Sequence, residues 1–268
     1  MKMYDKFVII PNWLIYDKKG EINEMIKEDK IGNELVATAI WIYYNKTPYN
    51  EVGFTIRILM EKLGIDTRKK SNKEKWINIV ETLIERKFIT WVEKPEQLNI
   101  DSIIRVETND DMNFVFDEEG NKIDYCILSA DKIRKILTLP YDRVIMLCMY
   151  TLGEIMVWKN SIGTKYIYDK NHKAETFYGS AEKLGKIINI SRNCWEKYSK
   201  ILDEEKIMIN QSYYKGTKRN TIYGFDEEEI KQGLKYEKQE YQEEPDTEEN
   251  EIDIKTIPIA KSLRRRIF

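Results

Sequence analysis

Apolar residues recur at helical spacing in the segment RNCWEKYSKILDEEK. Its large apolar residues Trp195, Tyr198 and Leu202 lie three and four residues apart, so they share one face of a helix. Ser191 stands directly before the segment and has a side chain typical of a helix N-cap. Two β-rich runs follow, IMINQSYY and NTIYGF, and a basic loop that contains glycine, Lys215–Arg219, joins them. The pattern predicts a helix with one buried face, followed by a β-hairpin.

The same pattern occurs twice in the chain. The clearest matches stand 119 residues apart: Trp76 with Trp195, Leu83 with Leu202, Glu85 with Glu204, and Lys87 with Lys206. The tetrad EKLG occurs at residues 61–64 and 182–185, and FVIIPNWLI from Phe7 resembles YCILSADKI from Tyr125. Each copy also has an apolar helix between these anchors, NELVATAIWIYYNK in the first and YDRVIMLCMYTLGEIM in the second. We therefore predict a repeated unit of helix, helix, turn, helix and two strands.

The first copy shows these elements with a longer, lysine-rich turn, IDTRKKSNKEK. Ser71-x-x-Glu74 has the form of a capping box, which predicts the start of the third helix. The buried face of that helix consists of apolar residues, namely Trp76, Val80, Leu83 and Ile84. FITWVE and DSIIRVE are the strands that follow. The long turn leaves the position of this third helix less well defined than that of its counterpart.

Charge is distributed unevenly along the chain, although 44 Lys and Arg nearly balance 46 Asp and Glu. Between Glu237 and Asp253 there are nine acids and one lysine, whereas the last fifteen residues carry five basic groups and no acid. This leaves a net charge of about +1 for residues 1–236. The acidic stretch has no apolar periodicity, so we expect a solvated, disordered linker after a folded body that ends near Lys235.

The sequence contains few residues suited to catalysis or metal binding. His172 is the only histidine, and the three cysteines, Cys126, Cys148 and Cys194, have no partner at ligand spacing. Neither GxxxxGK[ST] nor GxGxxG occurs, so the usual phosphate-binding loops are missing. We therefore expect no enzyme activity, metal or cofactor. No apolar run has the length of a membrane span and no signal peptide begins the chain, so we expect a cytoplasmic protein without membrane contact.

The repeated unit resembles the winged helix-turn-helix superfamily of DNA-binding proteins. The resemblance rests on the order of five features: a helix, an LG-type turn, a serine-capped helix, the motif Leu-x-Glu-x-Lys-Ile and a wing. The segment EKLGKIINISRNCWEKYSKILDEEKI of the second copy fits this order most closely. It implies a mainly helical α+β fold with two tandem winged-helix domains, residues 1–110 and 111–235, named here the first and second repeat. A disordered acidic tail, residues 236–268, follows them. The opening FVIIPNWL is similar to the F-x-x-I-P-x-x-L start of RepA-type plasmid replication initiators and phage replisome organisers.

A recognition helix enters the major groove with its N-terminal part near the bases, while the wing and nearby basic groups contact phosphates. The candidate DNA contacts of the second repeat are Arg192, Asn193, Lys197 and Lys200 on the helix, and Lys215, Lys218 and Arg219 in the wing. Those of the first repeat are Arg68, Lys69, Lys70, Lys73, Lys75 and Asn78. Arginine suits guanine and asparagine suits adenine, whereas lysine suits phosphate. Tyr213 and Tyr214 stand beside the wing, and Thr82 is expected on the outward helix face with Lys75 and Asn78.

Two other interpretations of these faces remain open. Lysine-rich helix faces are often simply solvated, and Glu74 and Glu196 weaken the positive potential of the two helices. Winged helices also serve as dimerisation modules. The aromatic residues Trp41, Tyr43 and Tyr44 favour a homodimer through the first repeat. Trp76 and Trp195 are expected in the core and not against bases.

We expect a sequence-specific double-stranded DNA-binding protein, a plasmid or phage replication initiator that binds origin repeats and recruits host replication proteins. The apolar and basic C-terminal peptide, Thr256–Phe268, is the candidate contact for a host replication protein. A transcriptional regulator with the same two domains is the alternative. A scaffold that binds proteins but not DNA is the third interpretation.

Overall fold

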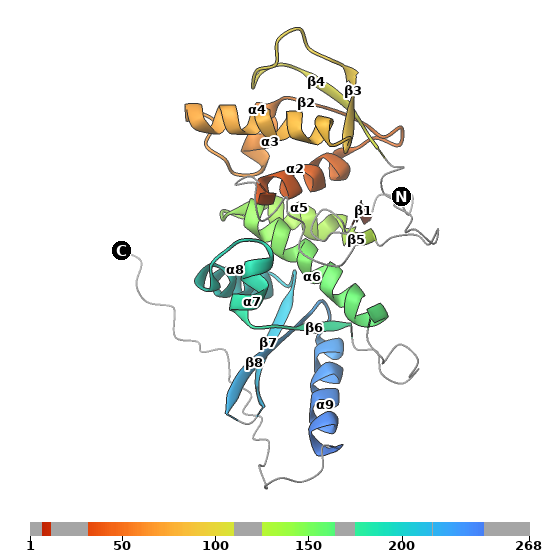
Figure 1. The fold of residues 1–268 in the computed structure, drawn as a ribbon, viewed down its shortest axis with the longest axis vertical. Coiled ribbons are helices and arrows are strands. Elements are labelled where there is room, and N and C mark those ends of the chain that lie inside the picture. The colour runs from red at the N-terminus through yellow and green to blue at the C-terminus, as the bar shows by residue number, and fades with distance from the viewer. Residues whose placement is uncertain (1–6, 12–31, 110–124, 164–174, 216, 244–268) are drawn as a thin grey trace.

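The computed structural model describes residues 7–11, 32–109, 125–163, 175–215 and 217–243 (Figure 1). The elements described in the first repeat are β1 (Phe7–Pro11), α2 (Gly32–Asn45), β2 (Glu51–Phe54), α3 (Ile56–Lys62), α4 (Lys70–Glu85), β3 (Ile89–Glu93) and β4 (Ile104–Thr108). Those that follow are β5 (Tyr125–Ser129), α5 (Ala130–Thr138), α6 (Arg143–Gly163), β6 (Thr176–Tyr178), α7 (Ala181–Ile187), α8 (Arg192–Glu204), β7 (Ile209–Lys215), β8 (Lys218–Gly224) and α9 (Glu227–Glu243). The predicted α+β class is confirmed. None of the helices in these residues combines the length and the apolar character needed to cross a bilayer.

The two repeats have the same order of elements. Each has a long apolar helix, α2 or α6, followed by a short strand, a pair of helices and a hairpin. Each contains a three-stranded antiparallel sheet with its last strand in the middle, in the orders β2-β4-β3 and β6-β8-β7. The predicted helices and hairpins are confirmed, and the pattern missed the short strands β1, β2, β5 and β6 and the helix α5. Residues 110–124 lie outside the described part of the chain, so the boundary between residues 110 and 111 stays a prediction.

The offset of 119 residues aligns the third helices of the two repeats, α4 and α8, but it does not align their second helices, α3 and α7. After α4 and α8 the chain turns at Lys87 and Lys206, 119 residues apart, with φ angles of 61° and 54°. After α3 and α7 the corresponding residues are Gly64, with φ of 78°, and Asn189, with φ of 51°. Glycine and asparagine adopt this left-handed conformation most easily at a helix end. EKLG thus ends α3 but lies within α7, so the predicted match of the two tetrads is wrong by about one helical turn.

Strands β1 and β5 join the beginnings of the two repeats. They pair antiparallel, and Ile9 lies opposite Ile127, its counterpart at an offset of 118 residues. Because corresponding residues face each other, the pair has approximate local two-fold symmetry. Helix α2 contacts β1, α6 contacts β5, and the two helices contact each other, as Figure 1 shows near the middle of the molecule. One hydrophobic cluster extends from the first repeat through this junction into the second.

Polar contacts between the repeats are reciprocal. Nη1 of Arg143, at the start of α6, donates to the carbonyl oxygens of Glu61 at 3.1 Å and Lys62 at 2.9 Å, at the end of α3. Nδ2 of Asn33, at the start of α2, donates to the carbonyl oxygen of Ile188 at the end of α7, at 2.7 Å. Carbonyl groups at a helix C-terminus lack partners within the helix. Each long helix therefore caps the second helix of the other repeat.

The aromatic residues of α2 are used inside the chain. Trp41 is 5% exposed and packs edge-on against Phe54, with ring centroids 5.5 Å apart, and Tyr43 is 2% exposed. Tyr44 is half-buried, and its hydroxyl accepts a hydrogen bond from Nε of Arg134 at 3.3 Å. The prediction that these residues offer a homodimer surface is therefore wrong, because Trp41 and Tyr43 are buried within the first repeat and Tyr44 contacts the second repeat of the same chain.

The folded part of the chain continues beyond its predicted end near Lys235, because helix α9 extends further. It runs to Glu243, eight residues beyond Lys235, so the first part of the acidic stretch is helical and not disordered. The helix packs on the outer face of the β7–β8 hairpin through an apolar cluster of Tyr213, Ile222, Ile230 and Leu234. Glutamates in its first turn interact favourably with the helix dipole and stabilise the start of the helix. The helix therefore begins before the acidic stretch and continues into it. Residues 244–268, with the candidate peptide Thr256–Phe268, lie outside the described part.

Candidate nucleic-acid interface

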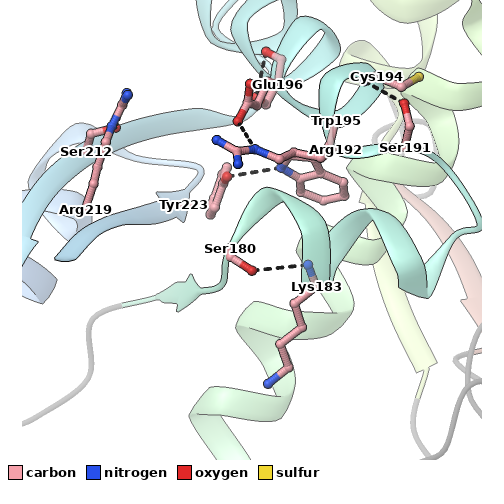
Figure 2. A network of polar contacts seen from close by, with 11 residues as sticks. Ser180, Lys183, Ser191, Arg192, Cys194, Trp195, Glu196, Ser212, Arg219 and Tyr223 are labelled. Carbon is pink, nitrogen blue, oxygen red and sulfur yellow. Dashed lines mark hydrogen bonds and ion pairs between the residues drawn. The ribbon is translucent and has the colours of Figure 1, made fainter.

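Serine N-caps begin both α7 and α8, and a glycine allows the close turn between the two helices. Oγ of Ser180 and Oγ of Ser191 each accept a hydrogen bond of 3.2 Å from the backbone N–H three residues later (Figure 2). A Cβ at Gly185 would lie 2.8 Å from the carbonyl oxygen of Ile190, so only glycine allows this close approach. Ser191 is confirmed as the N-cap of α8. Local contacts therefore fix the two helices relative to each other.

The inner face of α8 is anchored on the hairpin. Trp195, Tyr198 and Leu202 are buried, as the spacing predicted. Nε1 of Trp195 donates to the hydroxyl of Tyr223 in β8 at 3.0 Å, and the two rings meet edge to face with centroids 5.9 Å apart. Burial raises the pKa of Tyr223, so its hydroxyl stays protonated. The expected core position of Trp195 is confirmed.

The outward face of α8 is polar and carries three basic residues and two acids. Its exposed residues are Arg192, Asn193, Glu196, Lys197, Lys200 and Glu204. Nε of Arg192 lies 2.8 Å from a carboxylate oxygen of Glu196, one turn further along (Figure 2). The ammonium of Lys197 lies 4.7 Å from the ring centroid of the neighbouring tyrosine. Nζ of Lys200 is 3.9 Å from a carboxylate oxygen of Glu204. The structure thus places all four predicted residues of this helix on one exposed surface.

The strand register places Arg219 on the α8 side of the hairpin. Side chains alternate along a strand, and Arg219 stands four residues before Tyr223, which contacts Trp195 of α8. Nη2 of Arg219 donates to Oγ of Ser212 at 3.0 Å, and the residue opposite it is Tyr214. The predicted wing arginine therefore faces the same side as α8. The sequence pattern did not single out Ser212, although period-two alternation from Tyr214 indicates its position.

The hairpin is tighter than predicted. Strand β7 extends to Lys215, which pairs with Lys218 at the start of β8, so the prediction of a five-residue loop from Lys215 to Arg219 is wrong. The side chains of these two lysines lie outside the described part of the structure. Tyr213, which stands beside the wing in the sequence, is 5% exposed and packs against α9, on the opposite side of the hairpin from Arg219. The hairpin sequence, residues 209–224, contains three basic residues and no acid.

Helix α4 of the first repeat starts without a side-chain cap. Its N-cap is Lys69, which makes no capping hydrogen bond, and Ser71 already lies inside the helix. Glu74 forms an ion pair with Lys70, with a distance of 3.7 Å between Oε1 and Nζ. The predicted capping box is therefore wrong, because the helix begins two residues too early for Ser71 to act as its cap.

Acids accompany the basic residues of this turn. Nε of Arg68 lies 3.1 Å from a carboxylate oxygen of Asp66, and this hydrogen bond lowers the pKa of Asp66. Lys73 is half-buried near Asp101. Hydrogen bonds from Arg57, at 2.5 and 2.8 Å, lower the pKa of Asp101, and the charge of Lys73 adds a smaller effect. Asp66 and Glu74 therefore offset two of the positive charges expected in this turn, whereas Asp101 is already paired with Arg57.

Part of the predicted outward face of α4 points inward. Lys75 is half-buried and forms an ion pair with Glu34 of α2. Thr82 is buried, and its hydroxyl donates to the carbonyl oxygen of Asn78 at 2.8 Å. The placement of Lys75 and Thr82 on the outward face is wrong, because this edge of α4 packs against α2. The exposed residues of α4 are Lys70, Ser71, Glu74, Asn78, Glu81 and Glu85.

The hairpin of the first repeat differs from its counterpart in charge. Residues 89–108 contain four acids and two basic residues. Arg105 lies 3.1 Å from a carboxylate oxygen of Glu51 and 3.9 Å from one of Glu93. This hairpin therefore presents no excess of positive charge to a polyanion.

The described residues do not form a metal centre. They contain no group of three His, Cys, Asp or Glu side chains that is able to hold a metal ion. Cys126 and Cys148 are buried, which raises the pKa of each thiol, and Cys194 is half-buried. His172 lies outside the described part of the chain.

Comparison with known proteins adds no relative. The chain matches no protein-family model, no curated protein and no solved structure. The functional assignment therefore rests on the geometry and charge of the two repeats.

Proposed function

We propose that the chain is a non-enzymatic, sequence-specific double-stranded DNA-binding protein with two tandem winged-helix domains, in which the second repeat reads DNA. One observation carries this proposal. The outward face of α8 and the α8 side of an acid-free hairpin form one surface, held together by the hydrogen bond between Trp195 and Tyr223. A helix that enters the major groove beside a wing that contacts phosphates requires such an arrangement.

The charges of the two repeats favour the second one as the DNA reader. The exposed face of α8 together with the hairpin 209–224 carries six basic residues and two acids, a net charge of +4. The exposed face of α4 together with the hairpin 89–108 carries three basic residues and seven acids, a net charge of −4. The turn at residues 63–69 adds only one positive charge to the first repeat. Because DNA affinity depends on neutralising phosphates, the first repeat is poorly suited to the duplex.

The residues of the second repeat divide into two roles. Arg192 and Asn193 stand at the start of α8, where a recognition helix approaches base edges, and both have side chains that pair with bases in two places. Lys197, Lys200 and Arg219 flank them and suit phosphates. Base contacts determine specificity, whereas phosphate contacts determine most of the affinity and its dependence on salt.

Within this class we propose a plasmid or phage replication initiator. The tandem arrangement and the opening FVIIPNWL support this role. An initiator binds several tandem copies of its site, whereas a transcriptional regulator, the alternative, more often binds one inverted repeat. We assign protein contacts to the first repeat. A homodimer through this repeat remains a prediction, but the aromatic residues of α2 no longer support it.

Selection of bound duplexes from a random library, at two salt concentrations, tests the proposal. The full chain should enrich one sequence, and Arg192→Ala/Asn193→Ala should weaken binding to it by tenfold or more, since each base contact contributes about 1–3 kcal/mol. The matched control is Lys70→Ala/Asn78→Ala, which removes a cation and an asparagine from the exposed face of α4. We expect this control to change affinity by less than about threefold.

Two results would refute the proposal. The first is no enrichment of any sequence by the full chain at low salt, which would favour a scaffold that binds proteins. The second is an equal loss of affinity in the two double variants, because the second repeat would then not be the DNA reader. Circular dichroism of each variant establishes that its fold is intact.

A further inference from the structure

Glu196 is an acid in the middle of the proposed DNA-reading surface. Its side chain is 50% exposed, and it stands one turn into α8, between Asn193 and Lys197. A carboxylate at this place repels the phosphate backbone and lowers affinity for every duplex. An ion pair between residues four apart stabilises a helix by only about 0.3–0.5 kcal/mol. Such a pair could stand on any exposed part of a helix, so helix stability alone does not explain an acid on the DNA-reading surface.

The chemistry of Glu196 restricts the bases that it tolerates. An ionised carboxylate accepts hydrogen bonds and donates none. In the major groove only cytosine N4 and adenine N6 donate, whereas guanine O6 and N7 and thymine O4 accept. A carboxylate placed in the groove is therefore stabilised by a base with an exocyclic amino group and repelled by the edges of guanine and thymine.

The pair with Arg192 leaves the guanidinium able to read a base. Nε of Arg192 points to the carboxylate of Glu196 at 2.8 Å. The terminal nitrogens of the guanidinium remain as donors for O6 and N7 of a guanine. Arg192 is 67% exposed, so nothing in the described chain blocks this approach. The contact also orients Arg192 along the outward face of α8 (Figure 2).

We propose that Glu196 is a specificity-determining residue, which requires cytosine or adenine at one position of the DNA site and orients Arg192 onto a neighbouring guanine. This inference rests on the proposed function. It names the base chemistry that the second repeat selects and assigns to Glu196 the exclusion of guanine and thymine.

Helix α8 contains its own matched control. Glu204 is also exposed, at 59%, and also faces a basic residue four positions away, Lys200, at 3.9 Å. It lies eight residues beyond Glu196, which is about 12 Å along the helix axis and comparable with the width of the major groove. Glu196→Gln and Glu204→Gln therefore remove the same charge from the same helix face, one near the bases and one beyond them.

Selection from randomised duplexes with the full chain, the two glutamine variants and Glu196→Ala at one salt concentration tests the inference. The full chain should select cytosine or adenine at one position. Glu196→Ala should reduce that preference at least fivefold and increase binding to random duplex. Glu196→Gln should also bind random duplex more strongly, but it should select adenine and no longer cytosine, because a glutamine amide pairs with adenine N6 and N7. Glu204→Gln should keep the preference and show a similar increase in binding to random duplex.

The outcomes separate the inference from the proposed function. If the full chain selects a sequence and Glu196→Ala selects the same bases with the same strength, the inference is wrong and DNA binding stands. If the full chain selects no sequence, both fail. A preference for guanine or thymine that depends on Glu196 would also overturn the inference.

Discussion

Replacement of Glu154 by glutamine should change how the stability of the protein depends on pH. Glu154 lies in α6, near Lys132 of α5 and beside Tyr150. Burial raises its pKa to about 7, although the charge of Lys132 and a hydrogen bond from Tyr150 act in the opposite direction. Lys132 is held close by, with its ammonium 4.2 Å from the ring centroid of Phe225. The carboxyl group is therefore half protonated near neutral pH.

The size of the effect follows from the difference between the folded and unfolded pKa. A rise from 4.5 to about 7 corresponds to about 3 kcal/mol. The folded state binds the proton more tightly than the unfolded state, so this stabilisation is fully present below pH 4.5. It is lost as the pH rises through 7. Glutamine resembles the protonated acid, so Glu154→Gln should be more stable than the parent chain at pH 8.5 and nearly equal to it at pH 4.5.

Urea titration at pH 5.5, 7 and 8.5 measures this difference. The free energy of unfolding of Glu154→Gln minus that of the parent chain should increase by about 2 kcal/mol between pH 5.5 and 8.5. Subtraction removes the titration of all other groups. Glu81→Gln, on the exposed face of α4, is the control for the removal of one carboxylate from the chain. A constant difference for Glu154→Gln, or a variant less stable than the parent at pH 8.5, would refute the reasoning.

Three further predictions concern single contacts. Ser191→Ala removes the N-cap of α8 and should lower the free energy of unfolding, measured by urea titration, by about 1 kcal/mol. Ser71→Ala, inside α4, is the control and should change it by less than about 0.5 kcal/mol. Tyr223→Phe leaves the indole N–H of Trp195 buried without its acceptor and should cost about 1–3 kcal/mol, seen as a lower urea midpoint at unchanged slope. Arg143→Ala removes two hydrogen bonds to the end of α3. It should speed amide hydrogen exchange in α3, and unchanged protection there would show that Arg143 does not hold the two repeats together.

The elements that the sequence predicted best depend on neighbours within a few residues. Helix α8 follows from the spacing of Trp195, Tyr198 and Leu202 and from the N-cap at Ser191, all within twelve residues. The hairpin after it follows from two β-rich runs around a glycine. Each of these signals acts within one element or across one turn, so a single sequence contains the information that is needed.

The predictions that failed depend on distant parts of the chain. Lys75 faces inward because Glu34, 41 residues earlier, lies beside it. Trp41 and Tyr43 are buried because later parts of the first repeat pack on them: the ring of Trp41 contacts Phe54, and the hydroxyl of Tyr43 donates to the carbonyl oxygen of Phe88, 45 residues later. Tyr44 is covered by Arg134, 90 residues later, in the second repeat. Apolar residues on a helix indicate that the helix has a partner, but they do not indicate whether the partner belongs to the same chain. Only the three-dimensional arrangement distinguishes an internal junction from a dimer surface.

Comparison of the two repeats separates the residues that build the fold from those that face a ligand. At the offset of 119 residues the buried positions are alike, with Trp76 equivalent to Trp195 and Leu83 equivalent to Leu202. The outward positions of the same helices are unlike: Glu74 corresponds to Asn193, Asn78 to Lys197 and Glu81 to Lys200. A shared core makes both repeats fold in the same way, so it does not distinguish their functions. The outward residues of the two helices, together with the two hairpins, change the surface from acidic to basic. This is why the proposed DNA reader is the second repeat, and why Glu196, an acid that remains on the basic face, calls for a role of its own.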